Sequence, residues 1–271
     1  FLDADDTVSF DILTKLYEQV LENHYDIIFC DKKWIENSQN QRENTYLYSE
    51  NKILYEKEIK KEMEKRFSDP ISNVGIFGLT GRLIKRSIIT KNEIFFDEKL
   101  RYLEDETFSW QILSKIKSIK YLKFQLYNYN VNPNINSALS QSFSKGFPIS
   151  NFKVARDYIN ESLSNVGFSQ KTIENLSNQA FIFFIISALV SFSKSIALGK
   201  IEKISGNSIR NEFIKKIIDD EEILRAVKKY KRSKLESFLI PWAIKLKSKT
   251  LLTYACKKRA NQILSLRRKN I

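Results

Sequence analysis

Apolar residues follow two patterns along the chain, and the change between them lies near residue 145. Before about residue 130, short apolar runs alternate with stretches in which apolar residues recur every three or four positions. This alternation predicts strands and helices in one α/β unit. From residue 146 onward the strand signal disappears and the helical period remains. We therefore expect an α/β domain over residues 1–145 and an all-helical domain over residues 146–271, in a chain that is mostly helical overall.

The helical period is clear in the first helix and throughout the second half. The first helix carries apolar residues at helical spacing, with Thr7 or Ser9 as the expected cap: Phe10, Leu13, Leu16, Tyr17, Val20 and Leu21. Further helices are predicted over 55–67, 82–90, 152–163, 171–198, 208–218, 221–230, 235–247 and 251–266. Strands are predicted over 25–30, 119–122 and 125–129, with a polar loop or irregular hairpin over 36–52.

The most apolar run spans residues 180–192. Its 13 residues fall short of the ~20 that an α-helix needs to cross a bilayer, so the run favours a buried helix. A longer segment over 176–198 would be long enough to cross, but it includes Asn178, Gln179 and Lys194.

Composition favours a folded protein, with 42% hydrophobic and 28% charged residues. It also excludes several kinds of site. Cys30 and Cys256 stand in unrelated contexts and His24 is the single histidine, which excludes a disulfide framework, a zinc finger and a histidine-based triad. None of the seven glycines forms a G-x-G-x-x-G or P-loop motif.

The net charge of +13 is concentrated at the carboxyl-terminal end. Residues 223–271 hold 15 lysines and arginines against one acid, Glu236. Leucine, isoleucine, phenylalanine and tryptophan residues are interleaved with the lysines, which predicts basic amphipathic helices. Such helices favour an anionic membrane surface as the partner of residues 223–271. A plain solvated face is the next interpretation, and nucleic acid is not expected.

Two acidic clusters carry the candidate chemistry. Asp3-Ala4-Asp5-Asp6 follows an apolar strand end, and Glu104-Asp105-Glu106 opens a predicted helix. Both lie at strand-to-helix turns, where ligands collect at the carboxyl edge of open sheets. Carboxylates in one turn suit Mg²⁺ or Mn²⁺. Each cluster on its own is equally consistent with acids that favour a helix N-terminus.

Several segments, taken in order, resemble a known family. They are FLDADD, DIIFCD, GRLIKRSII, FFDEKLRYLEDETF and LYNYNVNPNINSALS, and they resemble the second part of family 2 glycosyltransferases with the GT-A fold, which build bacterial surface polysaccharides. The resemblance covers about residues 1–140. It implies a partial GT-A domain, since family members carry a further nucleotide-binding segment before FLDADD, and it implies that the chain as given is an incomplete fragment, inactive alone.

The resemblance implies roles for four carboxylates. Asp5 would be the main ligand of Mn²⁺ or Mg²⁺, and Asp3 would contact the metal or the ribose of the nucleotide-sugar donor, expected to be a UDP-sugar. Asp105 would be the catalytic base and Glu104 a supporting carboxylate. The reaction would invert the anomeric centre and transfer the sugar to a saccharide or lipid-linked acceptor. The expected location is cytoplasmic, peripheral on the inner face of the cytoplasmic membrane.

Two other classes of function stay open from the sequence. Asp3-Ala4-Asp5-Asp6-Thr7 matches D-x-D-x-T, the nucleophile motif of haloacid-dehalogenase-type phosphatases, in which Asp3 would be phosphorylated. That family needs strand signals that fade here after residue 130. The third hypothesis is a non-catalytic helical module that binds membrane or nucleic acid through its basic end.

Overall fold

The chain divides into two units with about equal shares of its internal contacts. A computed structural model describes residues 1–36, 40–41, 46–67, 75–131, 146, 148–232 and 236–269. Unit 1 comprises Phe1–Asp97, Glu104–Ile135 and Glu161–Phe168, and unit 2 comprises Glu98–Leu103, Asn136–Asn160 and Ser169–Ile271. The predicted boundary at residue 145 lies outside the described residues.

Unit 1 is built on a mixed sheet of six strands. They are β1 (Thr7–Val8), β2 (Ile27–Glu36), β3 (Asn40–Gln41), β4 (Lys52–Tyr55), β5 (Arg82–Ile84) and β6 (Ser118–Val131). The long strands β2 and β6 run parallel at its centre, β4 and β1 pair antiparallel with successive parts of β6, and β5 and β3 pair antiparallel with successive parts of β2. Each of the other four strands pairs with β2 or with β6. These two strands therefore determine where the rest of the sheet lies.

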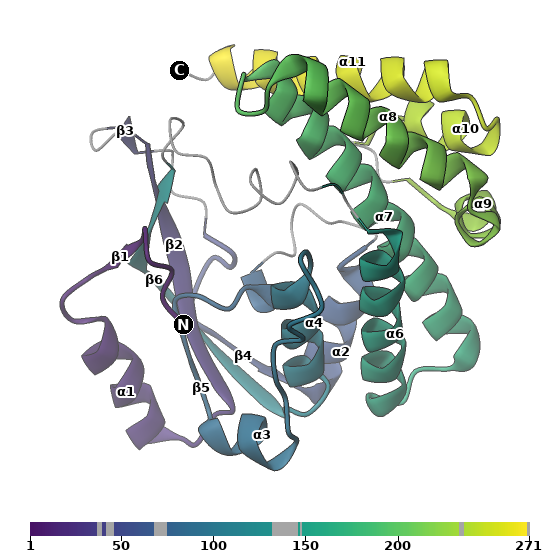
Figure 1. The fold of residues 1–271 in the computed structure, drawn as a ribbon. Coiled ribbons are helices and arrows are strands. Elements are labelled where there is room, and N and C mark those ends of the chain that lie inside the picture. Colours follow the sequence, from purple (N-terminus) through teal and green to yellow (C-terminus); the bar gives the residue numbers. More distant parts are fainter. Residues whose placement is uncertain are drawn as a thin grey trace. The chain divides into compact units, whose positions relative to one another are not determined.

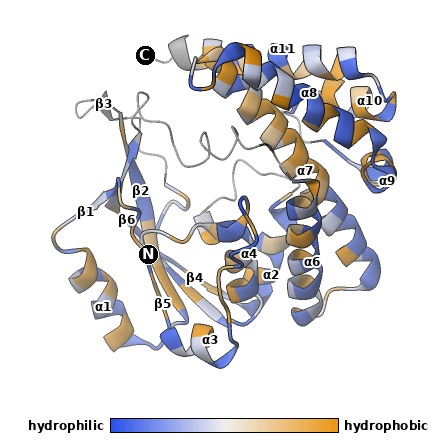
Figure 2. Ribbon diagram, in the orientation of Figure 1, coloured by the Kyte–Doolittle hydropathy of each residue, from blue (hydrophilic) through white to orange (hydrophobic). Residues whose placement is uncertain are grey.

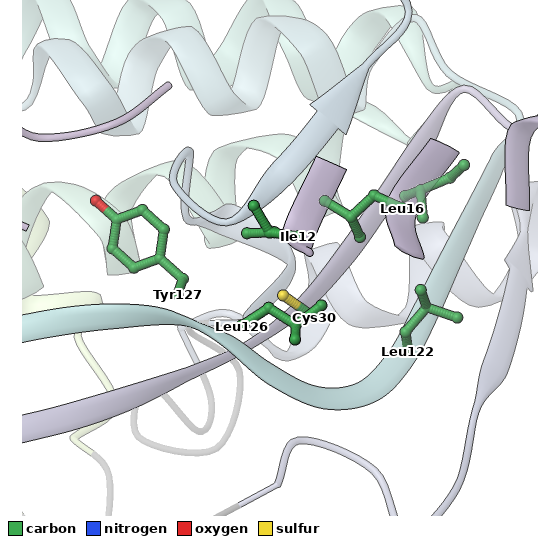
Figure 3. Close-up of a cluster of buried hydrophobic side chains, with 7 residues drawn as sticks. Ile12, Leu16, Cys30, Leu122, Leu126 and Tyr127 are labelled. Atoms are coloured by element: carbon green, nitrogen blue, oxygen red, sulfur yellow. The ribbon is translucent and has the colours of Figure 1, made fainter. Parts of the chain in front are cut away.

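Helices cover both faces of this sheet. They are α1 (Ile12–Glu22), α2 (Glu56–Lys65), α3 (Arg86–Lys91) and α4 (Glu104–Leu113), with a short 3₁₀ helix η1 (Gly75–Phe77). In Figure 1, α1 lies on one side of the sheet and α2 and α4 on the other. On the α1 side, Ile12 and Leu16 pack against Cys30, Leu122 and Leu126, as Figure 3 shows. Alternation along β2 sends Phe29 to the other face, where its ring contacts Tyr121.

Only part of the apolar set expected for the first helix meets the sheet. Leu16 is buried and Val20 packs against the same cluster, together with Ile12. Leu13, Tyr17 and Leu21 are exposed, as is Phe10, which precedes the helix. The helical period predicted the helix correctly, but the chain has apolar residues on two faces of it, and only the Ile12 face meets the sheet. The segment predicted as a helix over residues 82–90 is strand β5 followed by α3.

The two strands predicted near residues 119–129 form one strand, β6. Its pairing with β2 shifts register between Cys30 and Lys32, so that Leu122, Gln125 and Tyr127 lie opposite Cys30, Asp31 and Lys32. The extra residues of β6 form an irregularity of the bulge type, which bends a strand without ending it. The sequence interruption at Lys123 and Phe124 therefore marks a bulge.

The second half of the chain is helical, as predicted. The second half of the chain forms α6 (Ile149–Asn165), α7 (Gln170–Ala197), α8 (Lys203–Asp219), α9 (Glu221–Lys229), α10 (Leu239–Lys245) and α11 (Lys249–Lys269), and no strand occurs among its described residues. Helix α7 contacts α8, α9 and α11, and its Phe181, Leu189 and Phe192 are fully buried. The observed fold is thus α/β with a helical region, which confirms the predicted class.

Helix α7 is the one helix of the described residues that is long and apolar enough to cross a membrane. Its most apolar window has a mean hydropathy of 2.0, and 67% of that window is buried within the structure. Figure 2 shows this hydrophobic character along the helix. A buried core helix meets the same criteria of length and composition, so α7 alone is weak evidence for a membrane span.

Candidate active site

The first acidic cluster forms a turn that β6 holds in place. The Asp6 amide donates to the Asp3 carbonyl at 3.1 Å, which closes the turn. The Asp6 carboxylate accepts hydrogen bonds from the Tyr127 hydroxyl at 2.7 Å and from the Asn130 amide at 2.8 Å. The Asn130 side chain also donates to the Asp5 carbonyl at 2.7 Å. Asp6 is therefore an anchor, and its carboxylate oxygens are occupied by the protein.

The Tyr127 side chain links this turn to the core. Its ring belongs to the apolar cluster between α1 and the sheet, and Figure 3 shows the hydroxyl directed away from the other side chains of that cluster. Besides donating to Asp6, the hydroxyl accepts the Asp3 amide at 3.2 Å. Burial raises the pKa of Tyr127, so the hydroxyl stays protonated and remains a donor to Asp6.

The other two acids of the turn are placed differently. Asp3 and Asp5 are exposed, and within the described part of the chain their carboxylates form no hydrogen bond or ion pair. Partial burial, followed by the charge of Asp6, raises the pKa of Asp3. A bound cation would offset both effects. One or two protein carboxylates are enough for Mg²⁺, which keeps several waters, so Asp3 and Asp5 fit such an ion. Among the described residues no group of three or more potential ligands gathers.

The second cluster opens α4, and Glu106 fixes it to the unit. The Arg66 guanidinium binds Glu106 through Nε at 3.2 Å and Nη2 at 2.9 Å, and the Trp110 indole donates to the same carboxylate at 3.1 Å. Glu104 and Asp105 are exposed. The Asp105 carboxylate accepts the Glu106 amide at 2.7 Å, which satisfies one backbone donor of the first turn of α4. That contact occupies one oxygen of Asp105.

The Asp105 carboxyl group has an unusual affinity for its proton. Desolvation by the surrounding protein, followed by the charges of Glu106 and Glu104, raises the pKa of Asp105 to about 6. Its side chain nevertheless remains accessible to solvent. A carboxylate whose pKa lies near neutrality, and which a ligand can reach, has the properties of a general base.

The structure brings the two clusters into one region of unit 1. The Phe1 ring contacts the rings of Phe96 and Phe108, at centroid distances of 5.7 and 5.5 Å. Phe108 lies one turn after Asp105 on α4, so this contact places the start of the chain against that helix. Asp3, Asp6 and Asp105 all favour the charged form of Lys32 on β2.

Sequence reasoning identified Asp3, Asp5, Glu104 and Asp105 as candidates, and it missed their supports. Tyr127, Asn130 and Arg66 contact the clusters from more than thirty residues away along the chain. No local spacing connects residues so far apart. Lys32 was missed as well, although it stands directly after the quoted segment DIIFCD.

The comparisons with known proteins agree with this architecture. The chain matches no model of a known protein family. It is 28% identical over 137 residues to the uncharacterized glycosyltransferase EpsJ of Bacillus subtilis, a match that covers 49% of this chain and 38% of that protein. The chain therefore spans well under half the length of this curated relative.

Solved structures of S. aureus TarS 1-349 share the fold. The structure in complex with UDP-GlcNAc has a TM-score of 0.54 at 13% identity, covering 97% of this chain and 67% of that one. The structure of TarS 1-349 without a named ligand has a TM-score of 0.56 at 14% identity, covering 97% and 66%. Identities this low establish the fold alone. Together with EpsJ, they support a glycosyltransferase.

Proposed function

We propose that this chain carries the metal-binding and catalytic carboxylates of a glycosyltransferase. The protein would move a sugar from a nucleotide-sugar donor, expected to be a UDP-sugar, to a saccharide or lipid-linked acceptor in cell-surface polysaccharide synthesis. The observation that carries the proposal is that unit 1 contains both acidic clusters. One is a turn with two available carboxylates, and the other contains Asp105, whose pKa is raised. The fold shared with TarS, which was crystallised with UDP-GlcNAc, supports the class of donor.

The proposed roles follow from the contacts of each acid. Asp5 and Asp3 would hold Mn²⁺ or Mg²⁺, whose charge would neutralise the departing diphosphate. Asp105 would accept the proton of the acceptor hydroxyl as its oxygen attacks the anomeric carbon, a contribution of about 10²–10⁴-fold. Attack opposite the leaving group would invert that centre. Glu104, next to Asp105, would position the acceptor or support the base.

The test uses the natural full-length protein, a panel of UDP-sugars and saccharide acceptors, and added Mn²⁺ or Mg²⁺. We expect metal-dependent turnover that is lost in Asp5→Ala and in Asp105→Asn, with donor binding retained in Asp105→Asn. Asp157→Asn is the matched control, because Asp157 is an exposed carboxylate on α6. Loss of donor binding in Asp105→Asn would contradict its role as base. Absence of metal-dependent nucleotide binding in the wild type would favour the non-catalytic helical module.

We also propose that residues 223–271 hold the protein on an anionic membrane surface, peripheral to the inner face of the cytoplasmic membrane. Phe238, Trp242 and Leu246 follow each other at helical spacing, with Trp242 in α10 and the other two at its ends, and are 62, 51 and 53% exposed. Lysines flank these side chains, and Phe238 and Trp242 border an open pocket of about 390 Å³ that Lys245 also lines. Exposed tryptophan and phenylalanine beside lysine is the pattern of interfacial helices.

Flotation with vesicles tests this attachment. The protein should float with vesicles that contain phosphatidylglycerol and much less with neutral phosphatidylcholine vesicles, and raised salt should weaken the binding. Trp242→Glu should reduce flotation, whereas Lys216→Glu on α8 serves as a control for charge alone. Unchanged flotation of Trp242→Glu would refute the role of α10. Binding to DNA or RNA without binding to vesicles would replace the membrane by nucleic acid.

A further inference from the structure

Lys32 is a charged side chain for which the described residues provide no hydrogen-bond acceptor. Its ammonium lies over the rings of Tyr127 and Tyr129, 5.6 and 5.7 Å from their centroids, and the side chain is partly buried. Among the described residues it forms no hydrogen bond and no ion pair. A partly buried ammonium with three donors and only aromatic faces for partners lacks its usual compensation.

The carboxylates near Lys32 do not supply that compensation. Asp3, Asp6 and Asp105 all favour its charged form from a distance, but burial and the neighbouring charge of Arg82 oppose them and lower the pKa of Lys32. One of these acids, Asp6, already accepts hydrogen bonds from Tyr127 and Asn130. The ammonium is thus held among acids without pairing with any one of them.

A second cation approaches the same place. A Cβ added to Gly78 would lie 3.7 Å from the Lys32 ammonium and 3.4 Å from Nη2 of Arg82. Arg82 uses its two terminal nitrogens to hold η1, through the carbonyls of Ile76 and Gly75. Its buried Nε has no partner among the described residues. Two like charges therefore meet beside the bare backbone of Gly78, and in the described part of the chain neither pairs with a carboxylate, which is an arrangement that an anion would stabilise.

We propose that Lys32 binds a phosphoryl oxygen, and that this oxygen belongs to the diphosphate of the nucleotide-sugar donor. The assignment rests on the proposed glycosyltransferase function. Lys32 influences both the turn of Asp3 and the base Asp105, so it lies in the region where the leaving group must be held. An ammonium that faces a phosphate forms charge-assisted hydrogen bonds, which are about twice as strong as neutral ones.

The role of Lys32 in the transfer step is electrostatic. The acceptor oxygen forms a bond to the anomeric carbon and gives its proton to Asp105, while the bond from that carbon to the diphosphate oxygen breaks and its electron pair stays on the diphosphate. Lys32 shares the charge that develops there and transfers no proton. A preorganised cation aimed at developing charge stabilises the transition state more than the ground state.

Calorimetry on the natural full-length protein, with Mg²⁺ present, tests the assignment. We compare UDP with uridine for the wild type, Lys32→Met, Lys32→Arg and the control Lys33→Met, whose side chain points to the other face of β2. Lys32→Met should weaken UDP binding about tenfold to a hundredfold and leave uridine binding unchanged. Lys32→Arg should restore part of the loss, and Lys33→Met should bind UDP like the wild type.

The possible failures are distinguishable. Wild-type protein that binds no UDP would overturn the proposed function together with this assignment. Wild-type affinity for UDP in Lys32→Met would overturn the assignment alone. If that variant instead shows a raised KM for a phosphate-bearing acceptor, the phosphoryl oxygen belongs to the acceptor and the donor assignment is wrong. If Lys32→Met weakens the binding of UDP and of uridine equally, Lys32 acts only by supporting the turn and the assignment is wrong. Circular dichroism of Lys32→Gln shows whether the fold is retained without the charge.

Discussion

The contact between Arg66 and Glu106 gives the sharpest test of how the candidate site is supported. Both side chains are nearly buried, with 9 and 11% of their surface exposed, and two hydrogen bonds of 3.2 and 2.9 Å join them. Replacing Arg66 by methionine keeps much of its volume and removes the charge. The Glu106 carboxylate would then keep the Trp110 indole as its hydrogen-bond donor.

Removing one partner of a buried ion pair costs about 3–5 kcal/mol, because the remaining charge loses its compensation. With a urea dependence of about 1–3 kcal/mol per molar, Arg66→Met should lower the unfolding midpoint by at least about 1 M. The double variant Arg66→Met with Glu106→Leu removes both charges and should recover most of the loss. Tryptophan fluorescence during equilibrium unfolding in urea measures all of these midpoints.

An exposed ion pair provides the matched control. Lys216 and Glu212 lie one turn apart on α8 with side chains 54 and 65% exposed, and Lys216→Met should cost less than about 1 kcal/mol. A loss in Arg66→Met no larger than the loss in Lys216→Met would refute the reasoning, since burial would then make no difference. Because Glu106 directly follows Asp105, Arg66→Met should also lower turnover in the natural full-length protein.

Three further predictions concern the same unit. Tyr127→Phe removes the hydroxyl that donates to Asp6 and should cost about 1–3 kcal/mol of stability, measured by urea unfolding, and it should weaken Mn²⁺ binding measured by calorimetry. The pKa of Asp105 near 6 exceeds its unfolded value of about 3.9. The stability that its proton contributes is therefore complete below about pH 4 and is lost as the pH rises through 6. Asp105→Asn should accordingly be more stable than the wild type above pH 6, with the difference closing toward pH 4, and wild-type kcat/KM should rise with a midpoint near pH 6. Gly81→Ala should lower the thermal midpoint more than Gly167→Ala. Both have positive φ, 73° and 76°, but only at Gly81 would a Cβ meet a neighbour, Tyr127, at 3.2 Å.

The sequence was sufficient to predict the helical second half. The four carboxylates that it singles out are exposed in the structure, and their roles stay predictions. Helices α6, α8 and α9 follow from their periodicity, since each buries one recurring apolar stripe. Helix α7 follows from its apolar run, which is buried on all sides. The same reasoning could not tell which apolar residues of α1 are buried, because Leu13 is as apolar as Leu16 and only Leu16 meets the sheet. Only the position of the sheet decides which face is buried. Periodicity therefore identifies an element more reliably than it identifies the partner of that element.

The roles of the individual acids could not be separated from the sequence. Asp5 and Asp6 are adjacent and chemically identical, yet Asp6 is an anchor because Tyr127 and Asn130 reach it from β6. Glu106 differs from Glu104 in the same way, since Arg66 binds it. Which acid remains available to a ligand depends on contacts between distant parts of the chain, and spacing within one motif does not record them.

The parallel pairing of β2 with β6 has a consequence for how the protein folds. Residues 27–36 pair with residues 119–131, so the central strands meet only after a long intervening segment has been made and its ends brought together. Loop closure over such a distance is entropically unfavourable, and folds dominated by non-local pairing fold slowly. The turn of Asp3 depends on β6 for its anchors, so it should be among the last parts of unit 1 to become ordered. During synthesis, a nascent chain whose β6 is still inside the ribosome would already contain all four candidate carboxylates but would have no assembled site.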